Sequence, residues 1–189
     1  MRLILGVFSC CLFLGTATAQ LNPFSAIGKI VTTSMDVRTK AEVSTDTEIS
    51  AGASKRLLDD RKSEWAGVTL LVFAQHAVLA GAVKTAEVKK RVEDIVKRDA
   101  RIHSLKNELL VGDSGSLARD TALEAEINAT LTAAKGVSSV NMRWCATGGR
   151  VVLMGVAQSQ QEANLAASKV RGVKGVRGLK SHLRIVPKK

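Results

Sequence analysis

Apolar residues along this 189-residue chain follow two rhythms, one with a step of four and one with a step of two. Ile49, Ala53 and Leu57 are spaced by four, which is typical of one apolar stripe on an amphipathic helix. Alternation follows from Val68 to Val72, as in a strand with one covered face. The pattern therefore predicts a helix followed by a strand.

A returning strand, a second helix and a closing strand complete this pattern. We expect a tight hairpin turn at Gln75-His76, before apolar residues alternate again from Ala77 to Val83. Residues 102–111 alternate as a last strand does. The helix between them is predicted from the helical spacing of Val88, Val92, Ile95 and Val96.

The whole pattern recurs with an offset of 74 residues and without a gap. The helical stripe of the first copy maps onto Leu123, Ile127 and Leu131, and Gly148-Gly149 stands at the expected hairpin turn of the second. We therefore predict an α+β fold of two tandem α-β-β-α-β domains. Each has a three-stranded mixed sheet with both helices on one face. The predicted domains span residues 46–112 and 118–187.

Each face of the predicted sheets has residues that indicate close packing. Gly81 and Gly155 are expected to face the helices, where a missing side chain lets a helix approach the sheet closely. The opposite face of the second copy carries Val152, Met154 and Val156, although a solvated face would be polar. We therefore expect the outer sheet faces to pack on each other or on a partner.

The N-terminus is typical of an export signal. A short basic start is followed by an apolar run over residues 3–14 and by Ala17-Thr18-Ala19, small residues of the kind that a signal peptidase reads. We predict that residues 1–19 are a cleaved signal peptide. Two alternatives are lipidation of Cys10 or Cys11 and retention of the segment as an anchor.

Residues 20–45 are rich in Ser, Thr and charge, and we predict a tether with little structure of its own. Cleavage after Ala19 would leave Cys145 as the one cysteine, which excludes a disulfide framework. Cys145 is then a small half-buried strand residue or half of an intermolecular disulfide, and the strand pattern favours the first.

The formal net charge is +11, which favours polyanionic partners such as nucleic acid or anionic lipid. From Leu165 to Lys189 there are eight basic residues and no acidic one, whereas carboxylates dilute the basic residues between Lys84 and Lys106. We predict a basic lipid-binding face on the second domain, against the alternative of an ordinary solvated face. Its residues are Lys169, Arg171, Lys174, Arg177, Lys180 and Arg184.

Residues 149–156, Gly-Arg-Val-Val-Leu-Met-Gly-Val, precede an Ala-rich helix and the segment Gly172-Val173-Lys-Gly-Val176. This sequence resembles the BON domain, whose pattern is G-x-V-x-L-x-G-x-V followed by a helix ending in GVxxV. The first copy matches less closely. An export signal, a tether and two such domains are also the layout of certain envelope proteins, among them an outer-membrane lipoprotein and an osmotically inducible periplasmic protein.

The resemblance implies a non-catalytic protein of the periplasm, peripheral on the outer membrane, that binds anionic phospholipid and supports envelope integrity. The alternative is a soluble periplasmic chaperone-like protein that holds exported clients on apolar sheet faces. A lipidated cysteine at the mature N-terminus would favour the first, and Gln20 stands there instead.

No catalytic or metal-ligand spacing stands out, and we expect neither an enzyme nor a cofactor or metal. The three histidines, placed on a hairpin turn and on the last strands, have no carboxylate cluster beside them. Gly172-Val-Lys-Gly175 has the form of a nucleic-acid-binding GxxG loop, but that loop joins two helices, whereas this one joins a helix to a strand. We expect these glycines to end the helix in a left-handed turn, and no nucleic-acid partner.

Overall fold

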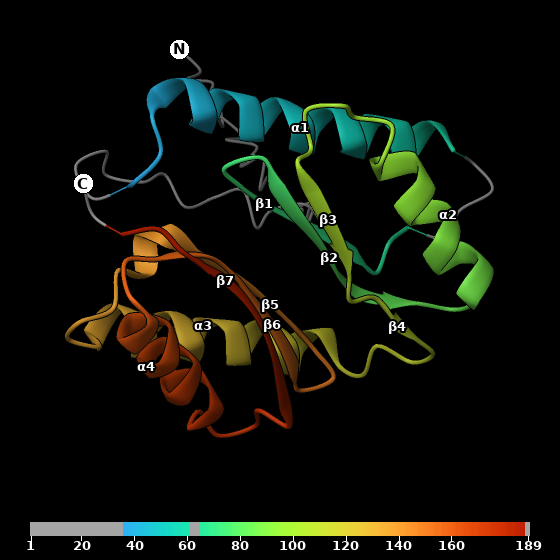
Figure 1. Ribbon diagram of the computed structural model, residues 1–189. Helices are drawn as coiled ribbons and strands as arrows, with labels where there is room; N and C mark the ends of the chain where they lie inside the picture. Colours follow the sequence, from blue (N-terminus) through green and yellow to red (C-terminus); the bar gives the residue numbers. More distant parts are fainter. Residues whose placement is uncertain (1–35, 61–64, 188–189) are drawn as a thin grey trace, which may run out of the picture.

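The computed structural model describes residues 36–60 and 65–187, which form two units stacked through their sheets (Figure 1). Two helices lie on the outer side of each sheet, so the molecule has four layers. The predicted signal peptide and most of the predicted tether lie outside the described residues. The first unit consists of α1 (Lys40–Asp59), β1 (Val68–Phe73), β2 (His76–Val83), α2 (Ala86–Val96), β3 (Ser104–Asn107) and β4 (Leu110–Val111). The second consists of α3 (Leu117–Ala133), the short 3-10 helix η2 (Ser139–Asn141), β5 (Met142–Thr147), β6 (Arg150–Ala157), α4 (Gln160–Arg171) and β7 (Gly178–Ile185).

Helix α1 begins before the predicted domain boundary at residue 46. The Thr39 hydroxyl accepts the Glu42 N–H, and the Glu42 carboxylate accepts the Thr39 N–H in return. This capping box satisfies two N–H groups that a helix start leaves free. The prediction of a tether up to residue 45 was therefore wrong over its last part, because its polar residues form a capped helix.

The two sheets have the same strand pairing, displaced by 74 residues. Strands β1 and β2 are antiparallel with Val68 opposite Gly81, and β5 and β6 are antiparallel with Met142 opposite Gly155. The closing strands β3 and β7 run parallel to β2 and β6, so both sheets are mixed as predicted. Each unit has the predicted order α-β-β-α-β, with η2 as an addition in the second.

The hairpin turn of the first unit lies one residue earlier than predicted, at Ala74 and Gln75, and His76 begins β2. Both turn residues have positive φ, 49° and 62°, although neither is glycine. The buried Asp46 carboxylate of α1 accepts both of their N–H groups at 2.7 Å, which supports this unfavourable backbone. In the second unit Asp120 accepts the N–H groups of Gly148 and Gly149 in the same way.

The closing strand of the first unit is interrupted, where one continuous strand was predicted. Strands β3 and β4 follow β2 in one register, but Leu109 between them leaves the ladder. The Leu109 N–H donates to the Asn107 side chain at 3.2 Å, and Lys89 Nζ donates to the Leu109 carbonyl at 2.7 Å. The equivalent positions in the second unit are Ser181 and Ala163, which lack these groups, so β7 is continuous.

Gly81 and Gly155 are required by the neighbouring strand and not by a helix. Both have positive φ, 109° and 130°. A Cβ on Gly81 would lie 1.9 Å from the carbonyl oxygen of Gly67, and one on Gly155 would lie 2.1 Å from that of Asn141. The predicted reason was therefore wrong: the segment leading into the preceding strand leaves no room.

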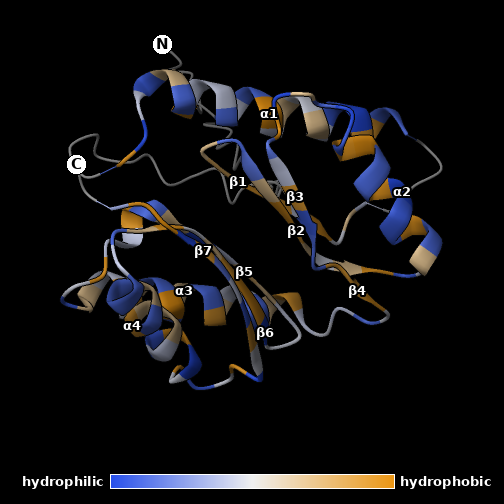
Figure 2. Cartoon of the chain, in the orientation of Figure 1, coloured by the Kyte–Doolittle hydropathy of each residue, from blue (hydrophilic) through white to orange (hydrophobic). Residues whose placement is uncertain are grey.

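Each unit has its own core between helices and sheet, and a third cluster fills the space between the sheets. Figure 2 shows apolar residues along the facing sheets and polar residues on the outer sides of the helices. The prediction that the outer faces pack on each other is confirmed. The third cluster consists of Leu71, Phe73, Val78, Ala80, Cys145, Val152, Met154 and Val156.

Candidate functional site

Equivalent residues of the two units meet at their interface. Val78 and Val152 are 74 residues apart, as are Ala80 and Met154, and all four lie in the cluster between the sheets. Glu108 and His182 are also 74 residues apart, and His182 Nε2 lies 2.8 Å from Glu108 Oε1. The same surface of each unit is thus used on both sides, as in a two-fold symmetric dimer. The two ends of the interface are therefore equivalent in backbone and differ in side chains.

At one end, the hairpin of the first unit meets the start of β5. The Arg38 guanidinium lies 4.1 Å from the centre of the Phe73 ring and forms ion pairs with Asp36 and Asp46. Burial opposes its charge, but these carboxylates outweigh it and raise the pKa of Arg38. Because Val37 N–H also donates to the Asn141 side chain at 3.0 Å, the segment before α1 ties the two units together.

Beside this hairpin, the His76 and His103 rings stand edge to face with centres 5.8 Å apart. His76 Nδ1 lies 2.6 Å from the Ser104 hydroxyl. Burial lowers the pKa of His76, and the charges of Arg184 and His103 lower it further. At this end of the interface Arg38 is paired with carboxylates, and Arg143 and Arg184 are further cations, each with a pKa that burial lowers.

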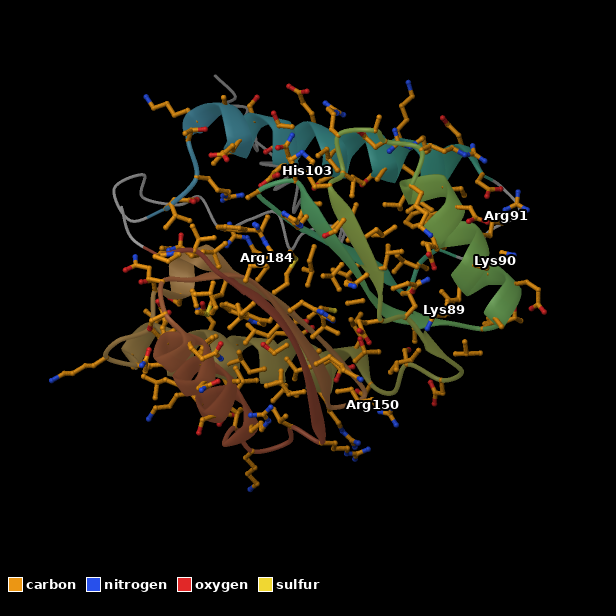
Figure 3. The ribbon with its side chains drawn as sticks, viewed as in Figure 1. Lys89, Lys90, Arg91, His103, Arg150 and Arg184 are labelled. Carbon is orange, nitrogen blue, oxygen red and sulfur yellow. The ribbon has the colours of Figure 1, made fainter. Side chains whose placement is uncertain are left out.

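At the other end lies a cleft of about 420 Å³ between the units. Its charged side chains come from separate elements: Lys89 from α2, Arg150 from β6, Arg177 from the α4–β7 loop and Lys180 from β7. Glu108 is the one carboxylate in the lining. Figure 3 shows Lys89 and Arg150 reaching this end from opposite units, whereas His103 and Arg184 lie toward the other end.

The cations of this cleft have few partners of their own. Among the described residues, no hydrogen bond or ion pair is made by the side chains of Arg150, Arg177 or Lys180. The Glu108 carboxylate is held by His182. With four basic side chains and one carboxylate in its lining, the cleft has a net positive charge and favours an anion.

The predicted basic face is divided by the structure into two groups. Leu179 and Leu183 of β7 pack against the helix-side core, so the alternate residues Lys180 and Arg184 face the other sheet. Lys169 and Arg171 lie exposed at the end of α4, and Lys174 is exposed in the following loop. Arg177 connects the two groups, because it is exposed in the loop and also lines the cleft.

Arg184 and Gly172 differ from their predicted roles. Arg184 is half-buried close to His76 of the first unit, apart from the exposed cations at the end of α4, and burial lowers its pKa. Gly172 has φ −77°, which is right-handed; the helix ends in tight backbone bonds, and Gly175 three residues later takes the positive φ of 101°. The prediction that the helix ends in a left-handed turn was therefore wrong at Gly172.

Arg150 and Lys89 are the cleft residues that the basic run beyond Leu165 did not indicate. Arg150 follows the hairpin turn and faces the other sheet together with Val152 and Met154. Its alternation with buried Val151 indicates that direction, but not the presence of Lys89 opposite. Only the stacking of the two units brings Lys89 and Arg150 to one cleft.

Within residues 36–60 and 65–187, no group of three His, Cys, Asp or Glu side chains is placed to hold a metal ion. Nor does any helix within those ranges have the length and apolar character needed to cross a membrane. Cys145 is buried between the sheets at 6% exposure, in agreement with its interpretation as a strand residue.

Comparisons with known proteins give one family match, which covers the second unit, and relatives that match a longer part of the chain. A family model described as the BON domain matches residues 119–187. The chain is 30% identical over 125 residues to an uncharacterized protein in the gshII 5′ region of Anaplasma centrale, covering 64% of this chain and 83% of that protein. It is 28% identical over 144 residues to the osmotically-inducible protein Y of Escherichia coli, covering 74% of this chain and 72% of that protein.

Among solved structures, a remote likeness is found to CdsD, a structural protein of the type III secretion system of Chlamydia trachomatis. The TM-score is 0.33 and the sequence identity 15%, over 75% of this chain and 65% of that chain. The chain thus spans less than two thirds of that structure.

Proposed function

This chain belongs to the BON-domain family, and we propose that it is an exported, non-catalytic envelope protein that binds membranes containing anionic phospholipid. We place it in the periplasm, peripheral on the outer membrane, in support of envelope integrity. The first unit, with the same element order and strand register as the second, is in this proposal a second BON domain.

The observation that carries the proposal is the exposed basic surface at the end of α4 and in the loop after it. Lys169, Arg171 and Lys174 are all exposed there, and no carboxylate interrupts the chain from Leu165 onward. Basic side chains near an anionic membrane each contribute about 1 kcal/mol. The first unit is less suited, because its basic residues are partly neutralised: Arg91, for example, pairs with Asp60 at 2.8 Å.

The chaperone-like alternative has a weaker basis in this structure. It depends on apolar sheet faces that are open to unfolded clients. Val152, Met154 and Val156 of the second sheet are 8%, 2% and 2% exposed, because the first sheet covers them. We therefore expect the folded protein not to suppress the aggregation of an unfolded exported protein.

Vesicle co-sedimentation tests the proposal, with phosphatidylcholine vesicles containing increasing shares of phosphatidylglycerol. We expect binding to require phosphatidylglycerol and to weaken with salt, since exposed charges are screened beyond about 10 Å at 0.1 M ionic strength. A triple Lys169→Gln, Arg171→Gln, Lys174→Gln variant should lower the partition coefficient by about two orders of magnitude.

The matched control removes three exposed cations from the first unit, through Lys40→Gln, Lys90→Gln and Arg98→Gln. It changes the net charge equally and should lower partitioning by less than about tenfold. Equal losses in both triple variants would show that net charge alone attracts the protein. Binding to vesicles of pure phosphatidylcholine, with a partition coefficient that does not change with salt concentration, would refute the proposal.

A further inference from the structure

We infer that the cleft between the two units is a binding site for a phosphate group of the kind found in the headgroup of an anionic phospholipid. The inference deepens the proposed function and rests on it for the choice of a lipid as the source of the phosphate. The site is built by Lys89, Arg150, Arg177 and Lys180.

The charges in the cleft leave donors free for a ligand. Arg150, Arg177 and Lys180 make no side-chain hydrogen bond or ion pair within the described part of the chain. Lys89 gives one N–H to the Leu109 carbonyl at 2.7 Å, so two of its three donors remain. Placing like charges around one cavity costs free energy, which a bound anion recovers.

The types of side chain favour a phosphate over a single small anion. A guanidinium offers paired N–H donors that match two phosphate oxygens, and two guanidinium groups together with two ammonium groups serve several oxygens at once. The cleft volume of about 420 Å³ is also far larger than a monatomic ion needs.

The remaining lining indicates that the phosphate is part of an amphiphile. Leu110 and Val152 line the same cleft beside the cations. Apolar walls next to a cluster of cations suit a phosphate that is esterified to a carbon chain, as in the glycerophosphate of phosphatidylglycerol. Inorganic phosphate would satisfy the charges and leave these walls in water.

The site requires both units. Lys89 belongs to α2 of the first unit, and the other three cations belong to the second. Glu108 of the first unit also lines the cleft, where one of its oxygens lies 2.8 Å from His182 Nε2 of the second unit, and its charge offsets one of the four cations. A bound phosphate would therefore bridge the units and stabilise their docking.

Most charges of this cleft are not repeated at the structurally equivalent end of the interface. There the positions of Arg150 and Arg177 are taken by His76 and His103, and the position of Lys89 is taken by Ala163. The position of Lys180 is taken by Lys106, and Arg184 stands at the position of Leu110. The cleft therefore has four Lys or Arg side chains where the equivalent place has two.

The test uses soluble headgroup analogues and the whole protein, with affinities measured by isothermal titration calorimetry. The probes are glycerophosphoglycerol, inorganic phosphate and glycerol. We expect glycerophosphoglycerol to bind with one site per chain and glycerol not to bind. An Arg150→Gln, Lys180→Gln double variant should lose at least about tenfold in affinity, because charge-assisted hydrogen bonds are removed.

The control variant is Lys169→Gln with Arg171→Gln, which removes the same charge outside the cleft. It should bind glycerophosphoglycerol as the unaltered protein does while losing affinity for phosphatidylglycerol vesicles. Circular dichroism at rising temperature establishes that both variants are folded. Inorganic phosphate binding more tightly than glycerophosphoglycerol would assign the phosphate site to a soluble ligand.

Two results would overturn the inference: no binding of either phosphate probe, or equal affinity in the cleft and control variants. Neither result depends on vesicles, so the proposed membrane binding is tested independently by the co-sedimentation experiment. Conversely, Arg150-dependent binding of glycerophosphoglycerol without any binding to vesicles would support the cleft as a phosphate site and refute the proposed membrane function.

Discussion

Cys145 illustrates how position decides the chemistry of a single residue. Its side chain lies between the two sheets at 6% exposure. Burial raises the pKa of the Cys145 thiol to about 11, with the Glu124 charge as a further cause. The reactive form is the thiolate, so a thiol of this pKa is about a thousandfold short of full ionisation at pH 8.

We predict that native Cys145 reacts with Ellman's reagent at pH 8 at least about 100-fold more slowly than free cysteine. Urea should restore the full rate, because unfolding returns the thiol to water. Rapid labelling of the folded protein, or a dimer on a non-reducing gel, would instead support an intermolecular disulfide. The alternation of β5 indicated that Cys145 is a strand residue. A local pattern cannot predict that the other unit covers it.

At the scale of elements, glycines that look alike in the sequence have different roles. Gly81 and Gly155 take a positive φ and touch the backbone that leads into the preceding strand. Gly172 has an ordinary helical φ, and a Cβ there would meet its nearest atom at 3.5 Å. The spacing of these residues identifies the pattern but not which of them needs to be glycine.

Gly155→Ala is therefore expected to lower the free energy of unfolding by about 3 kcal/mol or more, from backbone strain and overpacking together. Gly172→Ala should be neutral or stabilising by about 0.5–1 kcal/mol, since alanine restricts the unfolded chain. Urea unfolding followed by circular dichroism measures both. A Gly155→Ala protein as stable as Gly172→Ala would contradict the contact with the Asn141 carbonyl.

For the whole molecule, the interface between the sheets is the decisive feature. Met154 is 2% exposed and lies among apolar residues of both units. Its replacement by Asp would bury an unpaired charge at this interface and leave the helix-side cores intact.

Met154→Asp should lower the free energy of unfolding by more than about 3 kcal/mol. Small-angle X-ray scattering should show a larger radius of gyration if the units separate while folded. Asn164→Asp on the exposed side of α4 adds the same charge and should change stability by less than about 0.5 kcal/mol. Equal stability of the two variants would show that the sheets do not pack together in solution.

Helices, strands and their order could be predicted because each depends on a local period. The stripe of Ile49, Ala53 and Leu57 is fully buried, as is the equivalent stripe of Ile127 and Leu131. Errors arose where a distant side chain changed the backbone. The Asp46 carboxylate supports the turn at Ala74 and Gln75, and the Lys89 and Asn107 side chains interrupt the closing strand.

The amino-acid sequence by itself determined the two α-β-β-α-β units, their offset of 74 residues and the apolar outer face of the second sheet. These follow from periodicity, which needs only neighbours along the chain. The tertiary structure alone decided which cations share a cleft. Lys89 meets Arg150 because the two sheets stack with equivalent faces together, and this places the hairpin end of one unit beside the opposite end of the other.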